Sequence, residues 1–181
     1  MEIKVLLQRV RVPMGFLCAA LFCLVSRPTL RYMAWGLPLV VAGLALRIWS
    51  AGHIRKGREI AQSGPYAFTR NPLYLGSFLI GIGFAVQSGI WLLVPFFALV
   101  FLLIYLPVMR QEERELESVH GDAYLGYRRR VPLFVPLRWP RSSSRLRFSW
   151  ELAWRNREYN APVGALLAEL FLLFKVFYPF P

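Results

Sequence analysis

Long runs of apolar residues constrain the fold of this chain more than any other feature of its sequence. The five runs are 12–26, 33–49, 73–87, 90–109 and 161–178. A helix of about 20 apolar residues crosses a bilayer, with a usable range of about 17 to 25. Hydrophobic residues make up 56% of the 181 residues and charged residues only 18%, which excludes a disordered chain and is atypical of a soluble domain. The sequence therefore predicts an all-α, polytopic membrane protein with about five transmembrane helices.

The spacing of the runs predicts how the helices are connected. The runs 73–87 and 90–109 are separated only by a Ser-Gly pair, so we expect a tight helical hairpin there. The run 12–26 follows a basic start but has no small-residue cleavage site before the next apolar run, so we expect a spanning helix rather than a signal peptide. Residues 1–181 are expected to form a single transmembrane domain.

Positive charges are distributed unevenly among the segments that join the runs. The N-terminal arm, the segment before residue 73 and the segment 110–160 carry most of the 22 Lys and Arg residues, whereas only Arg27 and Arg31 separate the first two runs. Because cytoplasmic loops are enriched in Lys and Arg, we expect the N-terminus in the cytoplasm and the C-terminus on the opposite side of a prokaryotic inner membrane or the endoplasmic reticulum. Attraction to anionic lipids explains this charge, and we expect no nucleic-acid partner.

The first long cytoplasmic segment has a sequence suited to binding a carboxylate. Gly64-Pro65 indicates a turn, and Asn71-Pro72 is typical of a helix start with an asparagine N-cap. The N-terminal end of a helix is electropositive, and Arg70 adds a permanently charged guanidinium beside it. The alternative interpretation is a capped helix with a snorkelling arginine and interfacial tyrosines.

The second long segment begins where the fourth run ends, and it is rich in acidic residues. Four of the eight residues 110–117 are acidic, in a chain with only ten acidic residues. If the fourth helix continues past the membrane, Glu113 and Glu117 share one face while Glu112 points elsewhere. These carboxylates either bind a ligand ammonium or ribose hydroxyls, or they form a solvated helix end paired with neighbouring arginines.

Several other residues allow a structural as well as a functional interpretation. Gly81 and Gly83 in the third run either admit a ligand to the backbone or pack against another helix, as small residues do in membranes. Glu169 lies in the middle of the last run and is a candidate for binding substrate or a partner helix, whereas Lys175 lies near its outer end and can snorkel. His53 and the other histidine have no cysteine nearby, so no metal site is expected.

Taken together, the two segments resemble the isoprenylcysteine carboxyl methyltransferase and phospholipid methyltransferase family of integral membrane enzymes. The resemblance covers residues 47–136 and leaves the helix expected at 161–178 as a C-terminal extension. Asn71 stands where many relatives have histidine, and an amide cannot act as a base near neutral pH. The matching elements follow the family order: Gly64-Pro65-Tyr66, Arg70-Asn71-Pro72-Leu73-Tyr74-Leu75-Gly76, Gly81-Ile82-Gly83, Glu112-Glu113, and a Gly-x-x-Tyr-x-x-Tyr stretch at 121–127.

The resemblance implies a cytoplasmic site for S-adenosylmethionine. Acidic groups and tyrosine faces suit its ammonium and sulfonium, whereas Arg70 suits the carboxylate of the cofactor or of the acceptor. The catalytic residues are expected to be Arg70 and Glu113. The expected cofactor-binding residues are Tyr66, Arg70, Asn71, Pro72, Tyr74, Gly76, Gly81, Gly83, Glu112, Glu113, Tyr124 and Tyr127.

The resemblance also implies a lipid-like methyl acceptor, and we expect the carboxylate of a prenylated cysteine or a similar acid. A carboxylate acceptor needs no general base, whereas an amine acceptor would lose a proton to Glu112 or Glu113. The alternatives are a phospholipid N-methyltransferase, an NADPH-dependent sterol-type reductase that would use the arginines at 128–130, and a non-catalytic membrane subunit.

Overall fold

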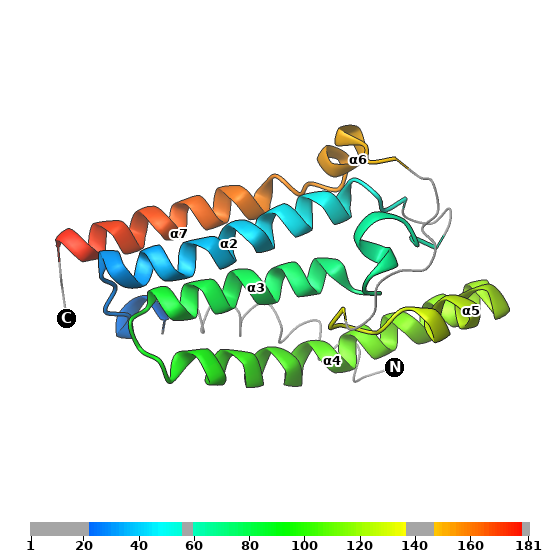
Figure 1. The fold of residues 1–181 in the computed structure, drawn as a ribbon, viewed down its shortest axis with the longest axis horizontal. Helices are drawn as coiled ribbons and strands as arrows, with labels where there is room; N and C mark the ends of the chain where they lie inside the picture. The colour runs from blue at the N-terminus through cyan, green and yellow to red at the C-terminus, as the bar shows by residue number, and fades with distance from the viewer. Residues whose placement is uncertain (1–21, 56–59, 137–146, 179–181) are drawn as a thin grey trace.

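A computed structural model describes residues 22–55, 60–136 and 147–178, and all regular structure in these ranges is helical. This confirms the expected all-α class. Residues 22–25 are helical and lead into the first complete element. The elements (Figure 1) are α2 (Leu30–Ala51), the 3-10 helix η1 (Gly64–Ala67), α3 (Pro72–Gln87), α4 (Leu93–His120), α5 (Asp122–Arg130), α6 (Trp150–Arg155) and α7 (Asn160–Phe177).

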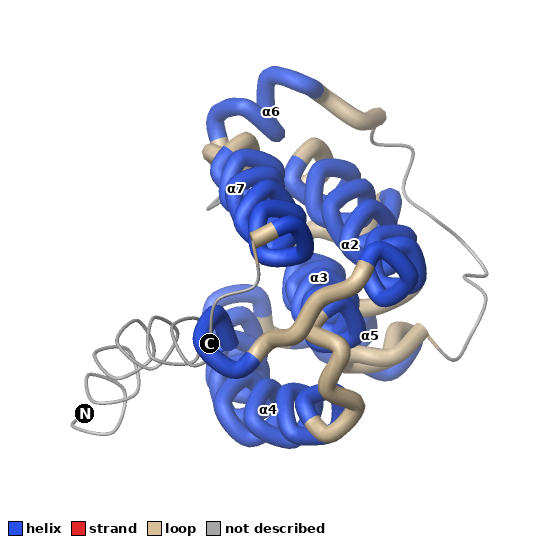
Figure 2. Tube along the Cα trace, turned by 90° about the vertical axis from the view of Figure 1, so that its left-hand side faces the viewer, coloured by secondary structure: helices blue, strands red, loops and turns tan. Residues whose placement is uncertain are grey.

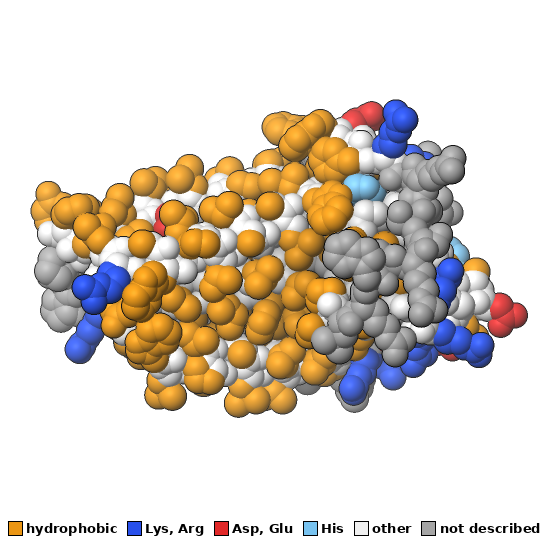
Figure 3. All heavy atoms as spheres, viewed as in Figure 1, with side chains coloured by type: hydrophobic (Ala, Val, Ile, Leu, Met, Phe, Trp, Pro, Cys, Tyr) orange, Lys and Arg blue, Asp and Glu red, His pale blue; other side chains and the backbone are white. Residues whose placement is uncertain are grey.

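Four long helices run side by side along the length of the molecule. α3 packs against α2 on one side and α4 on the other, and α2 also contacts α7 (Figures 1 and 2). α2, α4 and α7 are long and apolar enough to cross a membrane, whereas α3 is a shorter apolar helix of 16 residues. The expected span at 12–26 lies mostly outside the described residues. Hydrophobic side chains cover the face of the bundle that Figure 3 shows, and Lys and Arg gather at the end that carries α5. The chain is an integral membrane protein.

The hairpin between α3 and α4 is less tight than the sequence predicts. α3 ends at Gln87 and α4 begins only at Leu93, so residues 90–92 form a turn instead of starting the helix. Gly89 adopts a φ of +74°, and a Cβ atom there would lie 2.4 Å from the carbonyl oxygen of Arg27. Hydropathy did not distinguish this apolar turn from the helix that follows it.

Glycines allow α2 and α3 to approach until their backbones touch. A Cβ atom added to Gly36 would lie 2.3 Å from the carbonyl oxygen of Gly83, and one on Gly43 would lie 2.6 Å from that of Gly76. Small residues permit this kind of close packing in membranes, where burial of apolar area does not drive helices together. The close packing fixes α3, and with it the loop that precedes α3.

Polar contacts attach α7 to the other helices. The Gln87 amide donates to Glu169 Oε1 over 2.8 Å, so Glu169 binds a partner helix, one of its two expected roles. The Lys175 ammonium donates to the carbonyl oxygens of Cys23 and Leu24 over 2.7 and 3.1 Å. Lys175 is only 5% exposed, so the expectation that it snorkels is wrong. The last carbonyls of a helix attract a positive charge, which accounts for its burial.

Candidate functional site

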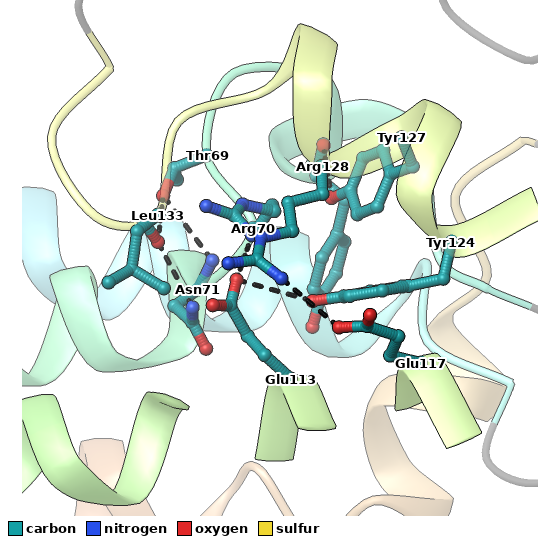
Figure 4. Close-up of polar contacts among 10 residues, drawn as sticks. Thr69, Arg70, Asn71, Glu113, Glu117, Tyr124, Tyr127, Arg128 and Leu133 are labelled. Carbon is teal, nitrogen blue, oxygen red and sulfur yellow. Dashed lines mark hydrogen bonds and ion pairs between the residues drawn. The ribbon is translucent and has the colours of Figure 1, made fainter. Parts of the chain in front are cut away.

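The predicted functional segments meet at the end of the bundle where α3 begins. The loop containing η1, the start of α3, the end of α4, and α5 converge there (Figure 4). The chain after α5 closes the group from one side, because the Arg70 amide donates to the carbonyl oxygen of Pro132 over 2.9 Å. Residues distant in sequence therefore form one compact polar cluster.

Arg70 and Glu113 form a buried ion pair at the centre of this cluster. Arg70 Nη1 donates to Glu113 Oε1, and the two side chains are 10% and 9% exposed. The Tyr124 hydroxyl donates to the same carboxylate oxygen over 3.3 Å (Figure 4). Arg70 Nε is buried and has no hydrogen-bond partner among the described residues. A buried charge is costly without its counter-charge, so each member of the pair depends on the other.

Two tyrosines of α5 lie beside the pair, and a third, Tyr66, is joined to them through its backbone. Tyr124 and Tyr127 lie edge to face with ring centroids 6.0 Å apart, and both are almost fully buried. The Tyr127 hydroxyl donates to the carbonyl oxygen of Tyr66 over 2.7 Å. The Tyr66 hydroxyl is buried and lacks a partner within the described ranges. These tyrosines are therefore part of the protein interior and not of a belt at the lipid headgroups.

Stability is expected to fall as the pH rises above 10, because the folded protein keeps phenol protons that the unfolded chain loses. Burial, with the Glu113 carboxylate, raises the pKa of Tyr124 from 10.0 to about 12, and burial also raises the pKa of Tyr66 and Tyr127. A group whose pKa is higher in the folded protein than in the unfolded chain contributes stability that is fully present below the unfolded pKa. This stability is lost as the pH rises through the folded pKa. Melting temperatures between pH 9 and pH 12 test this. Tyr124→Phe should flatten the decline, and an unchanged slope would contradict the assignment.

Asn71 has the predicted position but not the predicted role. It precedes α3 as its N-cap residue, yet its side chain makes no capping hydrogen bond. Instead, Asn71 Nδ2 donates to the carbonyl oxygen of Leu133 over 3.0 Å, and the Thr69 hydroxyl donates to the same oxygen. The N-cap expectation is therefore wrong for the side chain, because its amide is oriented by the hydrogen bond that Nδ2 donates to the chain after α5. Pro72 is buried in the first turn, where a proline costs no hydrogen bond.

The other acidic residues of α4 have separate partners. The Tyr74 hydroxyl donates to Glu112 Oε1 over 2.7 Å, so Glu112 joins the cluster from its outer side. Glu117 forms an exposed ion pair with Arg128 over 3.1 Å. α4 does continue past its apolar part to His120, but Glu113 is buried at the cluster and Glu117 lies at its edge (Figure 4).

The three glycines expected to bind the cofactor pack against neighbouring helices. A Cβ atom on Gly81 would lie 2.0 Å from the ring of Phe97, and those on Gly76 and Gly83 would meet α2. The structure therefore does not bring these glycines to the cluster. The remaining expected residues, Tyr66, Arg70, Asn71, Pro72, Tyr74, Glu112, Glu113, Tyr124 and Tyr127, gather around the start of α3.

A second ion pair beside the cluster was not foreseen. Arg47 Nε, near the end of α2, donates to Glu158 Oε1 over 2.5 Å, and Arg47 Nη1 donates to Ser77 Oγ on α3 over 2.5 Å. An arginine in an apolar run requires a partner, and the chain has few acidic residues to supply one. That shortage of acidic residues limits the possible partners of Arg47, but the sequence alone does not distinguish Glu158 from Glu169 as the partner.

The cluster has the chemistry to bind a zwitterion. The free Nε of Arg70 and the unpaired Tyr66 hydroxyl can donate to a carboxylate, and Arg70 in its fork geometry suits such a group. The carboxylates of Glu112 and Glu113 can accept from an ammonium. Across the described ranges, no group of three or more His, Cys, Asp or Glu side chains is placed to hold a metal ion.

Comparisons with known proteins show which family the sequence of this region matches. A family model described as phospholipid methyltransferase matches residues 32–123, which include α2, α3, α4 and the cluster's ion pair. No solved structure was found to match the chain.

Three curated relatives show how varied similar proteins are. The cobalt-zinc-cadmium resistance protein CzcN of Cupriavidus metallidurans is 35% identical over 103 residues, which cover 56% of this chain and 46% of that protein. The protein-S-isoprenylcysteine O-methyltransferase of Schizosaccharomyces pombe is 31% identical over 124 residues, 68% of this chain and 48% of the enzyme. The methanethiol S-methyltransferase of Crocosphaera subtropica is 35% identical over 71 residues, 39% of this chain and 27% of the enzyme. The chain thus spans less than half the length of these relatives.

Proposed function

Because the chain belongs to the phospholipid methyltransferase family, we propose that it transfers a methyl group from S-adenosylmethionine to a lipid-like acceptor at the membrane surface. The observation that carries this proposal is the buried pair of Arg70 and Glu113 within the matched region. The pair combines the two charges needed for the amino-acid end of the cofactor. Membership of a methyltransferase family favours this function over the reductase and the non-catalytic subunit.

The residues of the cluster fit this cofactor by charge. Arg70 would hold the carboxylate through its unpaired Nε, and Glu112 and Glu113 would hold the ammonium. When bound, S-adenosylmethionine supplies an electrophilic methyl group on a sulfonium. Aromatic ring faces attract such a cation, and Tyr124 and Tyr127, which are almost fully buried in this structure, lie beside the ion pair. The protein then contributes alignment and exclusion of water, since a direct displacement needs no covalent help.

We favour a carboxylate acceptor, as in a prenylated cysteine. Two observations support it: the relatives include an isoprenylcysteine O-methyltransferase, and no histidine among the described residues bonds to Arg70, Glu112 or Glu113. Phospholipid N-methylation is the alternative. It is compatible with Glu112, which is exposed and bonded only to the Tyr74 hydroxyl among the described residues, so that its carboxylate could accept the amine proton.

We place the cluster on the cytoplasmic side of the membrane. Lys and Arg gather at the end of the molecule that carries α5 (Figure 3), as the excess of positive charge in cytoplasmic segments requires. The acceptor's lipid part would reach the cluster from the bilayer, while the soluble cofactor would arrive from the cytoplasm. α7 begins near this end and runs to the opposite end of the bundle (Figure 1), so the C-terminal end of α7 would lie on the other side.

Methyl transfer by the purified protein in lipid vesicles tests the proposal. S-adenosylmethionine labelled on its methyl group would be supplied with a farnesylcysteine derivative or with phosphatidylethanolamine. We expect label in the farnesylcysteine product that base releases as volatile methanol, which identifies an ester. Base-stable label in phosphatidylethanolamine would support the N-methyl alternative, and failure of the protein to bind the cofactor would contradict both.

A further inference from the structure

We infer that Glu158, which lies beyond the residues that match the family, is a positioning residue for the proposed methyl-transfer site. It acts through Arg47, which it holds against the first turn of α3. This inference rests on the proposed function for its effect on catalysis, but the contact itself can be tested separately. The segment between α6 and α7 would then help to position the residues of the site.

Arg47 joins three parts of the molecule through one guanidinium. Its Nε donates to Glu158 Oε1 over 2.5 Å, and its Nη1 donates to Ser77 Oγ over 2.5 Å and to the carbonyl oxygen of Leu73 over 3.4 Å. Leu73 lies in the first turn of α3, shortly after Arg70 in the chain. A shift of Arg47 would therefore also move the first turn of α3, which sets the position of the cluster.

The backbone of α3 leaves room for this contact. A Cβ atom on Gly76 would lie 2.6 Å from Cγ of Arg47, so only glycine at this position lets the arginine stem pass across α3. Gly76 is the last residue of the motif at 70–76, and here it leaves space for the Arg47 side chain and for the close packing of α2. The clasp formed by Arg47 and Glu158 thus uses a residue of the matched region.

Glu158 is held in place by its own segment. Its side chain is 8% exposed, against 24% for Arg47. The Asn156 amide donates to the carbonyl oxygens of Ala51 and Ile54 over 3.0 and 3.3 Å, which fixes the turn before α7 onto the end of α2. Arg157 adopts a φ of +56°, a conformation that costs a residue other than glycine free energy. This turn places the carboxylate of Glu158 next to Arg47.

The charge balance makes Glu158 the counter-charge on which Arg47 depends. The Arg47 side chain is only partly exposed, at 24%, so its guanidinium is destabilised when the buried Glu158 carboxylate no longer balances its charge. A guanidinium that moves away from this position would break its hydrogen bonds to Ser77 and Leu73. Loss of the Glu158 charge should therefore loosen the start of α3 while the packing of α2 against the rest of α3 persists.

The variant Glu158→Gln tests the clasp by a readout that needs no catalysis. Hydrogen exchange of the segment 70–77 would be measured by mass spectrometry in lipid nanodiscs, with affinity for S-adenosylhomocysteine measured by calorimetry. We expect exchange in 70–77 to rise and affinity to fall, each by about tenfold, with exchange at 82–87 unchanged. The matched control is Glu151→Gln, an exposed glutamate on α6, which should behave as the parent protein.

A double variant shows whether Glu158 acts through Arg47. In an Arg47→Gln background, Glu158→Gln should add little, because the partner through which it acts is already lost. A full second effect would overturn the inference, as would unchanged exchange and affinity in Glu158→Gln when the parent binds S-adenosylhomocysteine. Failure of the parent to bind that compound would instead contradict the proposed function, and the exchange result would still decide whether the clasp exists.

Discussion

Replacing Glu113 by glutamine is expected to abolish methyl transfer and to lower the free energy of unfolding by about 3 to 5 kcal/mol. The variant removes the counter-charge of Arg70, whose side chain is only 10% exposed, and leaves that guanidinium buried and uncompensated. It also removes the carboxylate that accepts from the Tyr124 hydroxyl. Thermal unfolding in detergent, with methyl transfer from labelled S-adenosylmethionine by the folded fraction, would measure both effects.

Glu117→Gln is the matched control, since Glu117 lies one turn further along α4. Its ion pair with Arg128 is exposed, with side chains 37% and 48% accessible, and such pairs contribute at most about 1 kcal/mol. The double variant Arg70→Gln with Glu113→Gln should be more stable than the sum of the single losses predicts, because it leaves no unpaired charge. Equal losses in Glu113→Gln and Glu117→Gln, or additive losses in the double variant, would contradict the central role of the pair.

The helices could be predicted from the sequence because their signal is local. Apolar length alone located α2 and α7 to within a few residues, whereas the sequence left open whether the fourth helix continues through the acidic segment, as α4 does to His120. The turn at residues 90–92 was missed because its residues are as apolar as those of α4. Hydropathy reports burial in lipid, whereas the end of a helix depends on Gly89 and the contacts that it makes.

The pairing within the site could not be predicted in the same way. The two segments were recognised, yet the sequence left open whether Glu113 pairs with nearby arginines or with a ligand. The fold decides this, because Arg70 is 43 residues away in the chain and reaches Glu113 only through the packing of α3 on α4. Asn71 illustrates the same limit. Its capping preference is local, but the carbonyl oxygen of Leu133 comes from a segment that closes the site after α5.

The small residues of the third run had two interpretations, and the substitution Gly83→Ala separates them. A Cβ atom at this position would lie 2.7 Å from Cγ2 of Val40 and 2.8 Å from the carbonyl oxygen of Gly36. Backbone atoms cannot give way as a flexible side chain can, so α2 and α3 must move apart. We expect the free energy of unfolding to fall by about 3 kcal/mol, as measured by thermal unfolding in detergent.

Gly164→Ala provides the control, because an added Cβ on this residue of α7 meets nothing within 4 Å. Alanine also favours a helix over glycine by up to about 1 kcal/mol, so this variant should be as stable as the parent or slightly more stable. In Gly83→Ala, the loss of activity should follow the loss of folded protein, with the folded fraction still binding S-adenosylhomocysteine. A variant that melts normally but binds the compound poorly would show that Gly83 serves the ligand and that the packing interpretation is wrong.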